Sequence, residues 1–234
     1  MSSIAVIPAR SGSKRIPRKN VKTIAGLPAI AYPIRLAIDS GIFERVIVTT
    51  DDKSIADISI SLGAEVPFIR SSILSNDFAG TVDVVSDVAS FLIKNKEKVD
   101  YICCIYPVTP LLRVQRLQEA FELVANGNWD FVLPAIEFTT PIERGFKKTI
   151  FGSIELVNPE YMFTRTQDIS KTFHDAGQFY FGKTEAWIQK KPILGGNSTF
   201  LELSKYEVLD VDDIEDWAFL EQIIEFNKDK DIGD

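Results

Sequence analysis

A cluster of basic residues near the start of the chain is the strongest chemical signal in this sequence. Positions 10–22 hold six cations and no acidic residue, namely Arg10, Lys14, Arg15, Arg18, Lys19 and Lys22. Cations held this close repel one another unless an anion joins them. Because the chain as a whole is acidic, with a formal net charge of -7, this local cluster predicts a binding site for a polyanion.

The small residues between these cations favour close approach of the backbone to such an anion. Ser11, Gly12 and Ser13 are expected to let backbone N–H groups line a phosphate. The sequence has no G-x-G-x-x-G pattern, which argues against a dinucleotide site. On composition alone, the alternative is a solvated basic loop without a ligand.

Two aspartates in the last quarter of the chain form a second candidate site. Asp210 and Asp212 flank Val211 in an expected strand, and the period of two places both carboxylates on one face. Adjacent carboxylates repel one another unless a cation lies between them, and Mg²⁺ binds one or two carboxylates together with phosphate oxygens and water. Alternatively, Asp213 and the acids after it are first-turn helix residues stabilised by the helix dipole.

Short β-branched runs alternate with longer helical patterns and position these two clusters. The expected strands cover residues 4–7, 46–49, 66–69, 101–106, 130–136, 178–181 and 207–211. The expected helices cover residues 27–40, 54–62, 81–94, 114–125 and 213–226. This order predicts an α/β fold with a mostly parallel sheet flanked by helices, in which ligands bind beyond the carboxyl ends of the strands.

Residues 139–170 interrupt this alternation. Pro141, Gly145, Gly152 and Pro159 separate short apolar pieces there. Because a long segment without regular structure is uncommon inside a compact domain, we expect an inserted β arm on a single domain spanning residues 1–234.

Composition excludes several classes of protein. The acidic balance argues against nucleic-acid and anionic-membrane partners, and the longest apolar runs are too short to span a bilayer. Met1-Ser2-Ser3 leads into a strand without a signal-peptide pattern, so we expect a cytoplasmic protein. Cys103 and Cys104 are adjacent inside an apolar run, which predicts buried strand residues rather than a disulfide framework or a metal cluster.

The spaced motifs together resemble those of a known family, the cytidylyltransferases of sialic, legionaminic and pseudaminic acids, with the ketodeoxyoctonate enzymes as more distant relatives. The resemblance covers nearly the whole chain. It is carried by residues 7–20, Thr50-Asp51-Asp52, Arg70 with Leu74 and Asp77, Tyr106-Pro107-Val108-Thr109-Pro110, and Asp210-Val211-Asp212. It implies a Rossmann-like fold of the nucleotide-diphospho-sugar transferase (GT-A-like) type. It also implies transfer of CMP from CTP to the anomeric hydroxyl of a nonulosonic acid, with release of pyrophosphate and with Mg²⁺ as cofactor.

The same resemblance implies roles for individual residues. Arg10, Lys19 and Asp212 would be catalytic, and Asp210 and Asp212 would bind the metal. The nucleotide would be bound by Ala9, Arg10, Ser11, Gly12, Ser13, Lys19, Asn20, Arg70, Ala79 and Thr81. No residue is an obvious general base, and a metal-bound hydroxide or a bound water is expected in that role. Without the resemblance, Arg70 could be an ordinary surface arginine and Thr81 simply the N-cap of its helix.

The expected sugar pocket differs from that of the sialic-acid branch. Its implied residues are Tyr106, Arg165, His174, Gln178 and Tyr180. The sialic-acid branch has Gln at the position of Tyr106 and Asn-Gly before the penultimate strand, where this chain has residues 174–180. Both features are similar to the pseudaminate branch, so pseudaminic acid is the expected substrate, with legionaminate, N-acetylneuraminate and ketodeoxyoctonate as alternatives. His174, the sole histidine, could instead be structural.

The arm carries the remaining expectations. In this family the arm usually reaches the neighbouring subunit, where its basic residues approach the sugar carboxylate, and Arg165 matches that position better than Arg144. A homodimer is therefore expected. A non-catalytic nucleotide-sugar-binding module on the same scaffold is the alternative from a different class, and the joint presence of Arg10, Lys19, Asp210 and Asp212 argues against it.

Overall fold

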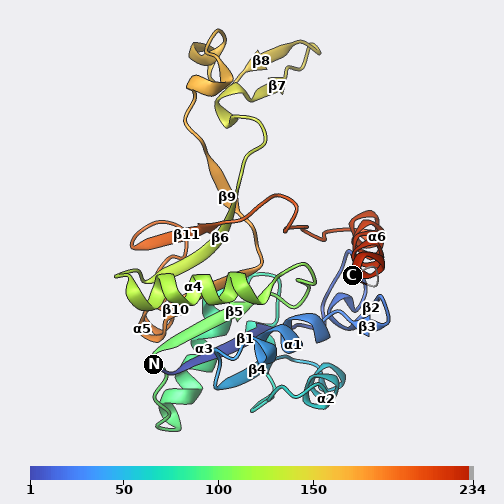
Figure 1. Ribbon diagram of the computed structural model, residues 1–234, viewed down its shortest axis with the longest axis vertical. Helices are drawn as coiled ribbons and strands as arrows, with labels where there is room; N and C mark the ends of the chain where they lie inside the picture. Colours follow the sequence, from blue (N-terminus) through green and yellow to red (C-terminus); the bar gives the residue numbers. More distant parts are fainter. Residues whose placement is uncertain (232–234) are drawn as a thin grey trace.

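The computed structural model describes residues 1–231. Within that range the central sheet has seven strands in the order β11-β6-β10-β5-β1-β4, with β9 also paired to β6 (Figure 1). Their bounds are β1 Ser3–Pro8, β4 Arg45–Thr49, β5 Tyr101–Ile105, β6 Phe131–Glu137, β9 Phe173–Asp175, β10 Phe179–Lys183 and β11 Ser198–Glu202. β4, β1, β5, β6 and β11 run in one direction, while β9 and β10 run in the other. The predicted α/β fold with a mostly parallel sheet is therefore confirmed.

Helices cover both faces of this sheet. They are α1 Ala31–Asp39, α2 Lys53–Ser61, α3 Thr81–Lys94, α4 Val114–Asn126, α5 Thr184–Ile188 and α6 Ile214–Asp231. The 3-10 turns are η1 Lys19–Val21, η2 Ser72–Leu74, η3 Ile142–Arg144, η4 Pro159–Tyr161 and η5 Thr166–Asp168. Among the described residues, no helix is both long enough and apolar enough to cross a membrane.

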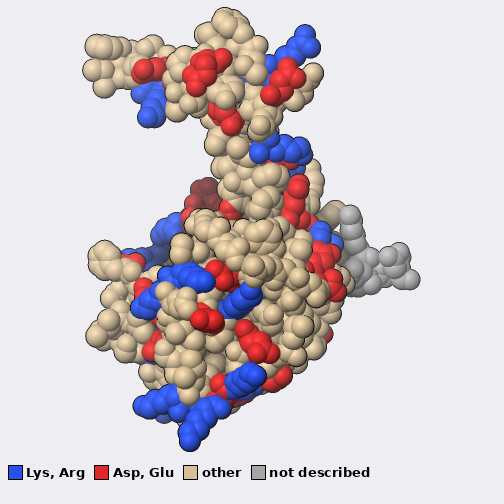
Figure 2. All heavy atoms as spheres, turned by 90° about the vertical axis from the view of Figure 1, so that its left-hand side faces the viewer, with Lys and Arg blue, Asp and Glu red and all other residues tan. Residues whose placement is uncertain are grey.

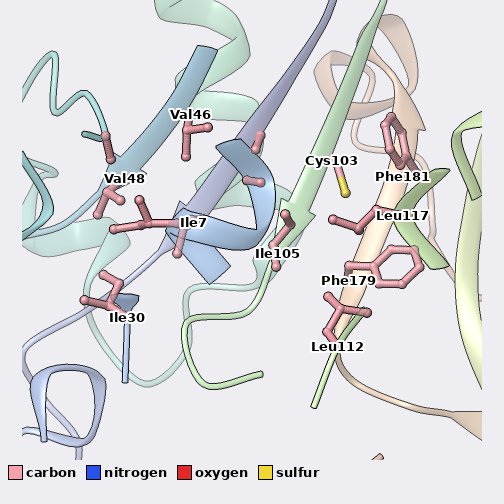
Figure 3. Close-up of a cluster of buried hydrophobic side chains, with 14 of the residues drawn as sticks. Ile7, Ile30, Val46, Val48, Cys103, Ile105, Leu112, Leu117, Phe179 and Phe181 are labelled. Carbon is pink, nitrogen blue, oxygen red and sulfur yellow. The ribbon is translucent and has the colours of Figure 1, made fainter. Parts of the chain in front are cut away.

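Strand alternation divides the core into two layers. On one face, Ile7, Val48 and Phe181 pack with α1 and α4 in a buried cluster (Figure 3). On the other face, Val6 and Ile47 belong to a cluster built with α3 and α5. Successive side chains of a strand point to opposite faces, and the two adjacent cysteines of β5 accordingly belong to different clusters. Both cysteines are buried and free, as predicted.

A third, smaller cluster fixes the basic segment against the C-terminal helix. Trp217, Leu220 and Ile224 of α6 are buried against Ile16 and Val211, which come from the two predicted sites. These three side chains form one apolar face of the helix. It holds the basic segment and the acidic pair, which are almost two hundred positions apart in the sequence, against one helix.

The arm leaves the sheet between β6 and β9 and projects from the body on a narrow neck (Figures 1 and 2). It contains the hairpin of β7 Phe146–Lys148 and β8 Ile154–Leu156. Three of its apolar side chains are almost completely exposed, namely Ile150 at 94%, Phe151 at 90% and Phe163 at 91%. The arm thus has no buried core of its own to cover these residues.

Two predicted strands are wrong. Of residues 66–69 only Ile69 makes a bridge, an isolated one to Thr50 just after β4, and Pro67 has no N–H to donate to a ladder. Residues 207–211 form no strand, because side chains occupy their carbonyls: Gln178 Nε2 donates to Glu207 O, and Lys19 Nζ donates to Val211 O. Asp210 and Asp212 nevertheless remain exposed on either side of buried Val211.

One predicted helix start and one expected N-cap also differ from the structure. The helix expected from residue 27 begins at Ala31, because the strand β3 Leu27–Pro28 pairs with β2 Thr23–Ile24 in a hairpin. Gly80, rather than Thr81, is the N-cap of α3, and no side chain caps that helix. The strand β11 and the short helix α5 were not predicted, because Ser, Thr, Gly and Asn dominate residues 195–199 and α5 has only five residues.

Candidate active site

A cleft of ≈ 660 Å³ opens between the basic segment, the 70–81 segment and the carboxyl end of β5. The predicted site residues that line it are Arg10, Ser13, Lys19, Asn20, Arg70, Ala79, Thr81, Tyr106, Gln178, Asp210 and Asp212. Such a position, beyond the carboxyl ends of parallel strands, is where ligands bind in open α/β sheets. The structure therefore brings most of the expected nucleotide, metal and sugar residues to one cavity.

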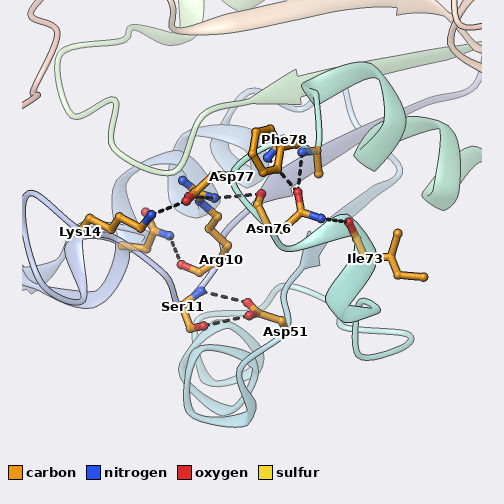
Figure 4. A network of polar contacts seen from close by, with 10 residues as sticks. Arg10, Ser11, Lys14, Asp51, Ile73, Asn76, Asp77 and Phe78 are labelled. Atoms are coloured by element: carbon orange, nitrogen blue, oxygen red, sulfur yellow. Dashed lines mark hydrogen bonds and ion pairs between the residues drawn. The ribbon is translucent and has the colours of Figure 1, made fainter.

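The backbone of the basic segment behaves differently from the prediction. The backbone N and the Oγ of Ser11 both donate to the carboxylate of Asp51, at 2.9 and 2.8 Å (Figure 4). The backbone N of Ser13 donates to Ser11 O at 2.9 Å. Ala9 is buried and, like Ser11 and Gly12, does not line the cleft. In this structure the N–H groups of Ser11 and Ser13 already donate hydrogen bonds within the chain, to the carboxylate of Asp51 and to the carbonyl oxygen of Ser11.

Arg10 contacts a loop that folds back over the cleft. Its Nη1 donates to Asp77 Oδ1 at 2.9 Å and to the carbonyl oxygen of Asn76 at 3.0 Å, and Lys14 Nζ pairs with the other oxygen of Asp77 (Figure 4). Lys14 and Arg10 lower the pKa of Asp77. A carboxylate thus occupies the position between two cations where a phosphate would be attracted.

Asn76 was missed by sequence reasoning. Its Oδ1 accepts from the N–H groups of Phe78 and Ala79, at 2.8 and 3.0 Å, and so fixes the turn that places Asp77. A Ser-Asn-Asp sequence does indicate a turn. The sequence gives no indication that this turn lies against Arg10.

Lys19 lies at the acidic side of the cleft. Its Nζ donates to the carbonyl oxygen of Val211, between Asp210 and Asp212. Burial lowers the pKa of Lys19, and the two aspartates oppose that shift. Its charge is therefore held in place, partly desolvated, beside the acidic pair.

Asp210 and Asp212 differ from the acids that follow them. Asp212 Oδ1 pairs with Arg15 Nη2 at 2.7 Å. Asp213 Oδ1 instead accepts from the N–H groups of Glu215 and Asp216, and Asp216 Oδ2 accepts from those of Asp212 and Asp213, so these two cap α6 reciprocally. The helix interpretation is therefore confirmed for Asp213 and Asp216, while the carboxylates of Asp210 and Asp212 face the cleft.

These two carboxylates fit a magnesium ion in kind. Among the described residues, no group of three or more His, Cys, Asp or Glu side chains could hold a metal on its own. Mg²⁺ commonly takes only one or two protein carboxylates, with phosphate oxygens and water as the remaining ligands. A two-aspartate site beside a basic segment could supply the protein part of such a ligand set.

Arg70 is buried rather than a surface arginine. It is 4% exposed, and its Nε donates to Ser75 Oγ at 3.1 Å. Its backbone N donates to Thr50 O at 2.8 Å, so the segment is tied to the end of β4. Burial lowers the pKa of its guanidinium. Asn20 is also buried, and its Nδ2 donates to the backbone oxygen of Arg10 at 2.9 Å.

The side of the cleft where sugar contacts were predicted is built from the start of α3, the residue after β5 and the turn between β9 and β10. Thr81 Oγ1 lies 2.8 Å from Tyr106 Oη, and the Tyr106 ring meets the Tyr180 ring edge-on, with centroids 5.6 Å apart. Tyr180 Oη donates to Asp175 Oδ2 at 2.5 Å. Gln178 Nε2 donates to Glu207 O at 2.8 Å. Tyr180 is covered by Tyr106 and does not line the cleft itself.

Two predicted sugar contacts lie away from this cleft. His174 is exposed on β9, where its ring packs against Phe138 at 4.7 Å between centroids and borders a separate hollow. Arg165 is on the projecting arm and does not line the cleft, and Arg144 donates to Thr166 Oγ1 within that arm. Neither Arg165 nor His174 can therefore be assigned to the cleft of its own chain.

Comparison with known proteins places this architecture in a family. The family model for cytidylyltransferases matches residues 4–231. The chain is 36% identical over 227 residues to a pseudaminic acid cytidylyltransferase of Campylobacter jejuni, covering 97% of this chain and 98% of that protein. It is 31% identical over 241 residues to a CMP-N,N'-diacetyllegionaminic acid synthase of Legionella pneumophila, covering 98% and 99%.

A solved structure shares the fold. The CMP:2-keto-3-deoxy-manno-octonic acid synthetase, solved in complex with CTP, superimposes with a TM-score of 0.72 over 97% of this chain and 100% of that one, at 15% sequence identity. That identity is low enough to speak for the architecture alone. Together with the family match over nearly the whole chain, it shows that this chain belongs to the cytidylyltransferase family and is a nucleotidyltransferase.

Proposed function

We propose that this enzyme transfers CMP from CTP to the anomeric hydroxyl of pseudaminic acid and releases pyrophosphate. The observation that carries the proposal is that cations of the basic segment and the Asp210–Asp212 pair line a single cleft. A triphosphate needs cations on one side, and a phosphate-bound divalent ion needs carboxylates on the other. The similarity to the Campylobacter jejuni protein along the full chain favours pseudaminic acid as the acceptor.

Arg10 and Lys19 bind and orient the phosphates. Both line the cleft, and Lys19 is fixed by the Val211 carbonyl. Attack by the anomeric hydroxyl on the α-phosphorus builds negative charge on the phosphate oxygens, and fixed cations stabilise that charge without reorganising. For Arg10 to reach a phosphate, Asp77 has to release it.

Asp210 and Asp212 would hold Mg²⁺. When bound, the ion supplies neutralisation of phosphate charge and orients the reacting groups. Arg15 is paired with Asp212 in the structure, so this guanidinium has to share or leave the carboxylate when the ion binds. Arg15 remains at the mouth of the cleft, where it can meet the departing pyrophosphate.

The base of CTP is placed on the Arg70 side of the cleft. Buried Arg70 and Ala79 both line the cleft. A buried, oriented guanidinium is a hydrogen-bond donor of fixed direction. Cytosine offers it acceptors at O2 and N3, so this wall suits a pyrimidine base.

The sugar acid is placed beside Thr81, Tyr106 and Gln178. Tyr106 presents a ring and one hydroxyl, which suits a less polar sugar wall than an amide would provide. N-acetylneuraminate, legionaminate and ketodeoxyoctonate are the competing acceptors for the same chemistry.

The enzyme is proposed to act as a homodimer. The arm exposes a row of large apolar side chains, and its guanidinium at Arg165 cannot reach the cleft of its own chain. A second copy of the chain would cover these apolar residues. Its sugar pocket would receive Arg165, whose guanidinium can form a bidentate pair with the carboxylate of the sugar acid bound there.

The decisive experiment measures pyrophosphate release with CTP, Mg²⁺ and each of the four sugar acids in turn. Turnover that is highest with pseudaminic acid supports the proposal. Turnover that is highest with another acid moves the substrate assignment to that acid. No release with any of them, by a folded protein, contradicts cytidylyl transfer to nonulosonic acids.

A further inference from the structure

The segment that joins β11 to α6 carries both proposed metal ligands and has no regular secondary structure of its own. It covers residues 203–213, and Asp210 and Asp212 line the cleft from it. Leu209 and Val211 pack against the apolar cluster around α6. Such packing has no directional component, so it does not by itself fix how the carboxylate between these two residues points.

Glu207 makes directional contacts for this segment. Arg116 of α4 donates through Nε to Glu207 Oε1 and through Nη2 to Glu207 Oε2, both at 3.0 Å. The backbone N of Ser204 also donates to Oε2 at 3.0 Å, and the backbone N of Glu207 donates to Ser204 O at 2.9 Å. The Glu207 side chain is 11% exposed, and its hydrogen bonds with Arg116 lower its pKa. Bidentate pairing with a guanidinium fixes both the position and the plane of this carboxylate.

The backbone of Glu207 connects the same contact to the cleft. Gln178, which lines the cleft and is 4% exposed, donates through Nε2 to Glu207 O at 2.8 Å. Further along the chain, Lys19 Nζ donates to Val211 O. The stretch between these two carbonyls is therefore held by hydrogen bonds at both ends, and Asp210 lies inside it.

We propose that Arg116 and Glu207 are positioning residues that hold Asp210 in the orientation required to bind the divalent ion. Neither of the two lines the cleft, so both act from outside it. Side chains that orient metal ligands from behind typically contribute about 10–100-fold to metal affinity or activity. This inference rests on the proposed function, because it assigns supporting residues to the proposed metal site. It predicts a defect in metal binding with an unchanged affinity for the metal-free nucleotide.

Two variants weaken the pair in different ways. Arg116→Lys keeps the positive charge but cannot pair in bidentate fashion, and Glu207→Gln keeps the size but removes the negative charge. Glu119→Gln is the matched control, since Glu119 accepts from Nη1 of the same arginine at 2.8 Å but lies on α4 rather than in the segment. Thermal unfolding shows which variants are folded.

The affinity of the enzyme for Mn²⁺–CTP measures the contribution of the metal site without turnover. Mn²⁺ also prefers oxygen ligands, and because it is paramagnetic, binding of the complex to the protein enhances water-proton relaxation. The Kd of Mn²⁺–CTP should rise by about tenfold in Arg116→Lys and in Glu207→Gln, and it should keep the wild-type value in Glu119→Gln. The Kd of CTP in EDTA, measured by calorimetry, should be unchanged in all three variants.

The outcomes separate this inference from the proposed function. An unchanged Kd of Mn²⁺–CTP in folded Arg116→Lys overturns the positioning role alone and shows that apolar packing is enough to place Asp210. An equal rise in the Kd of metal-free CTP also overturns it, because the defect would then be structural. If Glu207→Gln does not fold, Arg116→Lys decides by the same two constants. If the wild type binds Mn²⁺–CTP no more tightly than metal-free CTP, the metal assignment of the proposed function fails, and this inference fails with it.

Discussion

Arg15 Nη2 lies 2.7 Å from Asp212 Oδ1 at the mouth of the cleft. Asp212 and the hydrogen bond it makes raise the pKa of Arg15, with a smaller contribution from Asp210. The Arg15 guanidinium thus offsets part of the negative charge of Asp210 and Asp212. To bind there, Mg²⁺ would have to displace this guanidinium. Both partners are largely exposed, so the contact is easily exchanged and contributes little to stability.

Asp212→Ala should therefore remove most turnover while leaving the fold intact. We expect kcat to fall by at least about 10²-fold, a typical loss for an electrostatic group at a reacting phosphate, with an unchanged melting temperature. Pyrophosphate release at saturating Mg²⁺ measures the first and calorimetry the second. Asp39→Ala, an exposed acid at the end of α1, is the matched control. Near-normal turnover of Asp212→Ala would refute the metal assignment.

Arg10→Ala and Lys19→Ala should lower kcat more than they weaken CTP binding. In the proposed mechanism both cations act on charge that develops during transfer. Single-turnover rates and direct CTP titration separate the two effects, with exposed Lys94→Ala as control. If affinity falls and kcat does not, the two residues bind the nucleotide without contributing to the chemistry.

The sugar wall should discriminate strongly between acids. We expect kcat/KM for pseudaminate to exceed that for N-acetylneuraminate by at least about 10²-fold, the size expected for one lost polar contact. Tyr106→Gln should narrow this gap by restoring an amide at the wall. Steady-state kinetics with both acids checks it. Comparable values in the wild type would reject the pseudaminate assignment and leave cytidylyl transfer in place.

Removing the apolar character of the arm should abolish the proposed dimer. Phe151→Asp together with Phe163→Asp places charges on two side chains that are about nine-tenths exposed in the monomer. The body should keep its stability, because these residues contact no core. Sedimentation at micromolar concentration should show a dimer for the wild type and a monomer for the variant. A monomeric wild type contradicts the quaternary proposal.

Asp52 should stabilise α2 in a pH-dependent way. Its Oδ1 accepts from the N–H groups of Ser54 and Ile55, at 2.7 and 3.0 Å, and these bonds help to lower its pKa. The stabilisation is fully present above the unfolded pKa of about 3.9 and is lost as the pH falls through the lower folded value. Asp52→Ala should cost about 1 kcal/mol at pH 7, and the difference should shrink below pH 4.

Asp52→Asn is the matched control for that measurement. It keeps an N-cap acceptor without a titrating carboxylate. In denaturant unfolding, its free energy of unfolding should be slightly lower than that of the wild type at pH 7, and the contribution of this cap should change little on acidification. A pH-independent difference between wild type and Asp52→Ala would show that the carboxylate charge does not matter there.

The sequence alone predicts the parts of this molecule that depend on local pattern. The buried strands and the helices follow from periodicity, and the meeting of residues 10–20 with Asp210 and Asp212 follows from the family resemblance that their motifs carry. The predictions fail where a side chain distant in the sequence determines the local structure. Residues 207–211 lose their strand because Gln178 and Lys19 take carbonyls of that segment. Thr81 bonds Tyr106 instead of capping α3.

The same reason explains why the site was predicted less fully than the fold. That Asp77 pairs with Arg10 depends on a loop returning over the cleft, sixty-seven positions later in the chain. No local pattern encodes such a return. Arg165 and His174 were placed by family resemblance. Arg165 lies outside the cleft because it belongs to the arm that leaves the sheet between β6 and β9, whereas His174 lies on β9 itself.

The arm begins and ends on paired strands. Glu137 of β6 lies opposite Phe173 of β9, so the chain departs and returns at adjacent points of an antiparallel ladder. The pairing of these strands therefore holds the two ends of the arm together. The length of the arm adds little to the entropy cost of closing this loop. This makes the arm an exchangeable module: arms of relatives could be grafted at this junction without rerouting the chain through the sheet. Contacts made by the arm can thus diversify independently of the central sheet.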